Sequence, residues 1–259
     1  MLFIGLDLAW SPRNRSGVAM LVGDEQGGTL QQVDLLGDDT EITDYIQQHV
    51  GQQSAIVAVD APLRVPNETG QRRAETEINR AFRRYEAGAH PANRKNLTFN
   101  GVIRGEALVE ALEQQGFVHQ PTIEAGHPVR QIIEVFPHPA MIALFDLERT
   151  LKYKARPKRT QAERLAEWQR YQQHLRALAT ADPPLAGHEQ LLQQAVADLR
   201  GQRLKAYEDQ IDALFCAYIA LYAFRWGHTR CQTFGTLEEG YVFTPVPSTM
   251  WSAHHNHEP

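Results

Sequence analysis

The feature that most constrains the fold is a short apolar run near the start of the chain, residues 2–10, which reads LFIGLDLAW. A run of this length, followed by turn residues, is typical of a buried central strand. Asp7 interrupts it, and an unpaired carboxylate is costly in an apolar interior. Asp7 therefore needs a partner, a cation or a solvent-filled cleft, although a strand-end aspartate bonded to a turn also fits the pattern.

The next fifty residues predict more of the same sheet. Residues 18–22 and 29–36 predict two strands joined to the first by short turns, as in an antiparallel meander. Residues 39–50 predict a helix that begins at an Asp-Thr cap. Residues 55–60 form another apolar run that ends on an aspartate, Asp60. Carboxylates thus interrupt the first and fourth strands.

Residues 64–130 lose this regularity and predict a helical insertion after the fourth strand. It contains a polar helix at 71–85, a loop at 87–95 and a helix near 106–115. Its cations are Arg72, Arg73, Arg80, Arg83, Arg84, Arg94, Lys95 and Arg104. Two interpretations remain open. The segment is a solvated helix whose arginines pair with interleaved glutamates, or it is an arm that meets phosphate, which guanidinium groups bind bidentately.

The C-terminal half predicts a fifth strand and then helices. The strand, residues 131–136, again carries a carboxylate, Glu134, and a helix at 139–147 and a basic loop at 151–159 follow it. Residues 160–180 and 188–200 are polar enough for surface helices.

The last long helix, residues 207–226, is apolar nearly all round and is expected to be buried. Asp209 and Asp212 are expected in its first turn, where the helix dipole explains one acid better than two. Residues 239–245 predict an edge strand, and residues 252–259, with three histidines, a frayed terminus.

Composition narrows the classes of protein. A chain of 259 residues suffices for one large α/β domain or two small ones. The formal net charge of −5 gives no general attraction to polyanions, so nucleic-acid binding needs a local basic patch. Cys216 and Cys231 lack metal-ligand spacing and fit a reducing compartment. Without a signal peptide or a membrane-spanning run, a cytoplasmic protein with no membrane partner is expected, and its oligomeric state is left open.

The order of elements, with acids on three strands and on the final helix, resembles the ribonuclease H-like fold. Residues 209–217 resemble the D-x-x-D-A-L-x-x-A helix of Holliday-junction resolvases, and residues 5–7 with 16–17 resemble their first hairpin. The whole set is more closely similar to a family catalogued as domain of unknown function 429, described as predicted nucleases of this fold. The matching pieces are GLDLAW at 5–10, VDAPL at 59–63, EVFPH at 134–138, LKYK at 151–154 and DQIDALFCA at 209–217.

The resemblance implies a single domain over residues 1–259. Its expected fold is a mixed five-stranded sheet, three antiparallel strands plus two parallel ones, flanked by helices. The insertion at about 64–130 and extra surface helices at about 160–200 are added to that core. Nuclease activity is implied only by analogy, because a shared fold does not establish function.

The expected chemistry is metal-dependent hydrolysis of phosphodiester bonds in DNA or RNA. A two-metal site needs converging carboxylates that hold two Mg²⁺ or Mn²⁺ ions about 3.5–4 Å apart. The catalytic candidates are Asp7, Asp60, Glu134, Asp209 and Asp212, and among them Asp7, Asp60 and Asp212 are the expected metal ligands. Because the resolvases usually carry glutamate at the place of Asp60, either Asp60 or Glu134 completes the site. The candidates for holding the phosphate backbone are Arg83, Arg84, His90, Arg94, Lys95, Lys152 and Lys154.

Two other classes share this fold. Actin-like ATPases and sugar kinases need glycine- and hydroxyl-rich phosphate loops after the first strand. Here Asp7 is followed by the bulky sequence Leu-Ala-Trp, which disfavours ATP-dependent phosphotransfer. A non-catalytic nucleic-acid-binding or scaffold module is the other alternative, and the intact acids speak against it.

Overall fold

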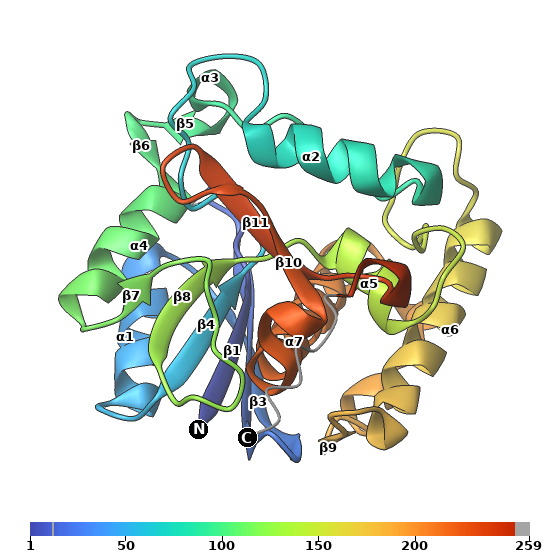
Figure 1. Cartoon of the computed structure of the whole chain (residues 1–259). Helices are drawn as coiled ribbons and strands as arrows, with labels where there is room; N and C mark the ends of the chain where they lie inside the picture. The colour runs from blue at the N-terminus through green and yellow to red at the C-terminus, as the bar shows by residue number, and fades with distance from the viewer. Residues whose placement is uncertain (12, 252–259) are drawn as a thin grey trace.

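The computed structural model of the chain describes residues 1–11 and 13–251 (Figure 1). The frayed terminus predicted for residues 252–259 lies outside the described residues. No helix in the described part of the chain is both long and apolar enough to span a bilayer.

A seven-stranded mixed sheet in the order β7-β8-β4-β1-β2-β3-β9 forms the centre of the molecule. Its strands are β1 (Leu2–Asp7), β2 (Ser16–Asp24), β3 (Gly27–Leu36), β4 (Ala55–Val59), β7 (Val118–His119), β8 (Arg130–Glu134) and β9 (Leu185–Ala186). The first three are antiparallel, and β4 and β8 run parallel to β1. This arrangement confirms the predicted ribonuclease H-like class, and the two-residue strands β7 and β9 extend the five predicted strands at the edges.

Helices cover both faces of the sheet. In Figure 1, α1 (Asp39–Val50) and α4 (Arg104–Gln114) lie on one face and α7 (Gly201–Trp226) on the other. The side chains of β1 alternate between these layers, as those of a pleated strand must. Leu2, Ile4 and Leu6 pack with α1 and α4, whereas Phe3 packs with α7. Asp7 is in phase with Phe3 and therefore projects from the α7 face.

Two glycines let the main chain of α7 lie directly on the sheet. A Cβ atom at Gly5 would lie 2.0 Å from the carbonyl oxygen of Ala213, and one at Gly17 would lie 2.0 Å from that of Asp209. Gly17 is also the partner of Asp7 across the β1–β2 ladder. Any larger residue at either position would push the helix away from the strand end that carries Asp7.

The start of α7 corrects one prediction. The helix begins at Gly201 and not at residue 207, so Asp209 and Asp212 lie more than two turns inside it. The dipole of a helix acts within its first turn, and it therefore does not account for these two acids. The prediction failed because the added turns are exposed and polar, without the apolar pattern that reveals the rest of the helix.

The insertion between β4 and β8 contains α2 (Arg73–Phe82), α3 (Arg94–Leu97), the short hairpin β5–β6 (Thr98–Phe99 and Val102–Ile103) and α4. In Figure 1, α2 crosses the end of the molecule toward which β1, β4 and β8 run. It packs on a second hairpin, β10 (Cys231–Thr236) and β11 (Gly240–Pro245). The strand predicted at 239–245 is confirmed, but its place at the edge of the sheet was wrong, because β11 pairs with β10 and is joined to the residue after β8 by a bridge between Val135 and Phe243.

The segment after β8 contains α5 (Pro137–Leu144) and α6 (Gln161–Ala177), which Thr160 caps. α6 buries Trp168 and Tyr171 and is thus part of the core as well as the surface.

The prediction of a second surface helix at 188–200 was wrong. Residues 191–193 and 196–198 form isolated 3₁₀ turns there. Leu192, Val196 and Leu199 are buried at helix-like spacing, which explains the prediction.

Candidate functional site

A cavity of about 1270 Å³ opens at the carboxyl ends of β1, β4 and β8. Because these strands are parallel, the acids that end them, Asp7, Asp60 and Glu134, all reach its wall. The carboxyl edge of parallel strands is also where open α/β sheets bind their ligands. The cavity is therefore the first candidate for a functional site.

Asp7 and Asp60 are the acids of this cavity that lack partners. Both are half-buried, and no described residue donates a hydrogen bond to either carboxylate. Burial, reinforced by the neighbouring carboxylate of Asp212, raises the pKa of Asp7 well above its usual value. Burial also raises the pKa of Asp60 to about 7, against the opposing effect of the Lys154 ammonium. The fold thus holds two carboxylates close together in surroundings that make their charged forms less favourable.

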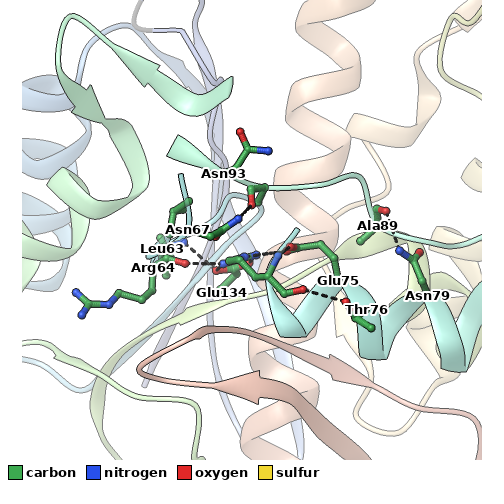
Figure 2. Close-up of polar contacts among 12 residues, drawn as sticks. Leu63, Arg64, Asn67, Glu75, Thr76, Asn79, Ala89, Asn93 and Glu134 are labelled. Carbon is green, nitrogen blue, oxygen red and sulfur yellow. Dashed lines mark hydrogen bonds and ion pairs between the residues drawn. The ribbon is translucent and has the colours of Figure 1, made fainter. Parts of the chain in front are cut away.

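Glu134 is engaged in a closed network. Strand register places it beside Val59, which packs with α1 and α4, so it leaves the sheet on the face opposite to Asp7 and Asp60. There its Oε1 lies 2.5 Å and its Oε2 2.9 Å from the Arg72 guanidinium, and the amide of Leu63 donates to Oε2 at 2.8 Å. Glu75 binds the same guanidinium at 2.6 Å (Figure 2). Asp60, and not Glu134, is therefore the acid whose side chain lies on the same face of the sheet as that of Asp7.

Asp212 lies behind the cavity and not in its wall. Its side chain is fully buried; Oδ1 accepts a hydrogen bond from the Tyr153 hydroxyl at 2.7 Å, and Oδ2 lies 2.7 Å from the Lys154 ammonium. The contact with Lys154 is an ion pair without the angles of a directed hydrogen bond. Asp209 does reach the cavity, and its Oδ1 accepts a hydrogen bond from Lys205 at 2.5 Å.

The predicted phosphate contacts divide into two groups. His90, Lys152 and Lys154 line the cavity, where Lys152 pairs with Glu86. The other four, Arg83, Arg84, Arg94 and Lys95, do not line it. Arg84 stacks on Tyr85 at 4.5 Å, and Arg94 pairs with Glu106 at 3.1 Å, while Arg83 and Lys95 are exposed elsewhere.

Sequence reasoning missed most of the cations that do line the cavity. They are Arg13, Arg15, Arg156, Arg159, Arg203 and Lys205. Two belong to the β1–β2 loop, two to the predicted basic loop at 151–159, and two to the early turns of α7. The loop at 151–159 carried a usable signal, since its basic character was already evident. Arg203 carried none, because its helix was expected to begin later.

The carboxylates do not form a ready-made metal centre. Within residues 1–11 and 13–251, no group of three or more His, Cys, Asp or Glu side chains is arranged to hold a metal ion. The expected ligand set of Asp7, Asp60 and Asp212 does not meet that condition. A smaller set does fit Mg²⁺ chemistry, because this ion is often held by one or two carboxylates together with waters and substrate phosphates. Asp7 and Asp60 provide such a pair.

Comparison with known proteins assigns the chain to a family. A search of curated proteins gave no match. The sequence profile of the family described as protein of unknown function (DUF429) matches residues 5–235. This span runs from β1 into β10 and includes every element that contributes a carboxylate to the cavity. Since the match covers most of the chain, this protein belongs to the DUF429 family.

Proposed function

We propose that this protein hydrolyses phosphodiester bonds of nucleic acid at the cavity lined by Asp7 and Asp60, with Mg²⁺ or Mn²⁺ as cofactor. One observation carries the proposal. Two carboxylates that accept no hydrogen bond from any described residue lie together, and a basic rim surrounds them. A cytoplasmic location is part of the proposal, and the two cysteines, both buried and free, are compatible with it.

The charges of the cavity favour an anionic substrate. Arg72 is neutralised by Glu75 and Glu134, Lys152 pairs with Glu86, and Lys205 pairs with Asp209. Five cavity-lining arginines form no salt bridge with any described carboxylate: Arg13, Arg15, Arg156, Arg159 and Arg203. A net-acidic protein thus concentrates unneutralised positive charge around two acids, which is how a local patch attracts a polyanion.

The cavity's own residues suit distinct tasks in this reaction. Asp7 and Asp60 would hold the divalent ion, which when bound supplies positive charge to the phosphate and lowers the pKa of a water. Arg156 and Arg203 would bind non-bridging phosphate oxygens, as guanidinium groups do bidentately. Trp10, which lines the same cavity and is 61% exposed, offers a ring on which an unpaired base can stack.

Cleavage of labelled single-stranded DNA, single-stranded RNA and a branched DNA junction, with millimolar Mg²⁺, Mn²⁺ or chelator, tests the proposal. Wild-type protein should cleave at least one of these substrates when metal is present, and none when chelator is present. Asp7→Asn and Asp60→Asn should each lower the rate by about 100-fold or more, since even outer-shell changes at metal sites cost about 10–100-fold. Asp44→Asn, an exposed acid on α1, is the matched control. Equal cleavage by wild type and Asp7→Asn would contradict the proposal, and metal-independent binding without cleavage would favour the scaffold alternative.

A second experiment compares two pairs of arginines. Arg156→Gln with Arg203→Gln should weaken single-strand binding and reduce the slope of log affinity against log salt by roughly 0.7 for each phosphate that the variant no longer neutralises. Arg83→Gln with Arg84→Gln removes the same charge outside the cavity and should leave both quantities unchanged. The reverse result would place the nucleic-acid path at the 3₁₀ turn after α2, within the segment where the sequence first suggested it.

A further inference from the structure

Lys154 places a positive charge among the acids of the cavity. Its ammonium lies 2.7 Å from Asp212 Oδ2, and its side chain is 28% exposed, so it faces the buried acid on one side and the cavity on the other. Asp212, Asp7 and Asp60 all act on it electrostatically, and together they raise the pKa of Lys154 well above its usual value despite its burial. A single ammonium therefore interacts with three carboxylates and can neutralise only one of them.

The loop that carries Lys154 is anchored on both sides of it. The preceding side chain, Tyr153, is fully buried against Trp168 and Tyr171 of α6, and its hydroxyl holds Asp212. The amide of Lys152 donates to Glu167 of the same helix at 2.6 Å, and Arg159 donates to the carbonyl of Lys154 at 3.0 Å. These contacts fix the main chain on both sides of Lys154. The fold itself therefore positions the lysine beside the acids.

A divalent ion bound to Asp212 Oδ2 would lie about 2.0–2.2 Å from an oxygen that already has the Lys154 ammonium 2.7 Å away, so the two cations would compete for it. The described residues contain no three-ligand metal arrangement, and both carboxylate oxygens of Asp212 already have partners within the chain. One of its oxygens is bonded to Tyr153 and the other faces Lys154. The cation that the fold provides for this acid is thus part of the chain.

We propose that Lys154 is the resident cation of this site: it neutralises Asp212, excludes it from metal ligation, and limits the cavity to one divalent ion held by Asp7 and Asp60. In this arrangement Asp212 is a positioning residue for Lys154. The inference rests on the proposed function in taking Mn²⁺ as the relevant ion and Asp7 with Asp60 as its ligands. Its test measures binding and not cleavage, so either can fail while the other holds.

The test counts bound Mn²⁺ from the electron paramagnetic resonance signal of the free ion. The wild type should bind one ion at most, and Lys154→Arg should behave in the same way because it keeps the charge. Lys154→Met removes the charge at similar length and should bind Mn²⁺ about tenfold or more tightly, because a like charge within a few ångströms of the ion is gone. Adding Asp212→Asn to Lys154→Met should abolish that gain.

Two results would overturn the inference. One is Lys154→Met binding Mn²⁺ no better than the wild type. The other is a wild-type protein that binds two Mn²⁺ ions, a measurement that needs no variant and remains informative if Lys154→Met does not fold.

Discussion

Two groups of carboxylates share one edge of the sheet, and they differ in how completely the fold satisfies them. In the closed network, Glu134 and Glu75 enclose the Arg72 guanidinium, and all three side chains are at most 3% exposed. In the open cluster, Asp7 and Asp60 face a cavity without a donor from any described residue.

Asp7, Asp60 and Glu134 look alike in the sequence, since each ends or follows an apolar strand. They are separated by what the rest of the chain brings to them. Glu134 receives a guanidinium and a backbone amide, and it therefore has little left to offer a ligand. Asp7 and Asp60 receive neither a guanidinium nor an amide from any described residue, whereas burial raises the pKa values of all three acids. A carboxylate that a fold leaves unsatisfied at a cost to stability is a better candidate for chemistry than one that is merely buried.

Breaking the closed network should have the largest effect on stability. Arg72→Met leaves two buried carboxylates uncompensated, which typically costs about 3–5 kcal/mol. We expect the melting temperature to fall by roughly 10 °C or more. Arg73→Met, the next residue, removes a 58% exposed arginine and should cost at most about 0.5 kcal/mol. Similar melting curves for the two variants would show that the closed network is not what stabilises this edge.

Removing the hydroxyl that holds Asp212 should have an intermediate effect. Tyr153→Phe deletes a buried hydrogen bond to a carboxylate and should destabilise the protein by about 1–3 kcal/mol in urea or thermal unfolding. Tyr45→Phe is the control, because the Tyr45 hydroxyl is buried without a partner among the described residues. Its removal should be neutral or stabilising. If Tyr153→Phe is equally harmless, the open cluster is not anchored from behind as its contacts indicate.

The smallest effect concerns the pH dependence of the open cluster. The pKa of Asp60 is about 7, against 3.8 in the absence of burial, so the folded state binds this proton more tightly than the unfolded state. The associated stability is fully present below about pH 4 and is lost as the pH rises through about 7. Asp60→Asn never ionises, and its stability should therefore rise relative to wild type across that window.

After allowance for the partial exposure of Asp60, the free energy of unfolding of Asp60→Asn should exceed that of the wild type by about 1–2 kcal/mol above pH 7. His138, whose pKa burial lowers to about 4, acts in the opposite direction but is common to both proteins and cancels in the difference. Melting temperatures of the two proteins from pH 4.5 to 8 provide the measurement. A difference that stays flat with pH would mean that Asp60 is better solvated than its surroundings indicate.

The sequence was sufficient for the fold class, and of the five acids that it singled out, all but Asp212 reach the cavity. Apolar runs and turns reveal strands, and a carboxylate inside such a run is visible without any structure. Whether Asp60 or Glu134 accompanies Asp7 was not predictable, because that depends on strand register and on which face of the sheet each side chain leaves. A shift of one residue in the register of a strand moves its acid to the opposite face of the sheet.

The basic rim was the least predictable part of the site. Charge density along the chain pointed to Arg83 and Arg84, but these residues lie in the 3₁₀ turn that follows α2 and do not line the cavity. The rim is assembled instead from three segments that are distant in sequence, and Arg203 belongs to helical turns with no apolar pattern. Long-range assembly of exposed side chains leaves no periodic signal for sequence reasoning to detect.

The contact of Gly5 and Gly17 with α7 has a consequence for how this protein can vary. The separation between the end of β1 and the acids of α7 is set by main-chain atoms touching main-chain atoms, with no side chain between them. Substitutions in the surrounding core can therefore be absorbed by repacking, but a methyl group at either glycine cannot. In a saturation-mutagenesis library, Gly5 and Gly17 should therefore tolerate as few substitutions as the carboxylates whose spacing they determine, although neither glycine has a side chain that takes part in the chemistry.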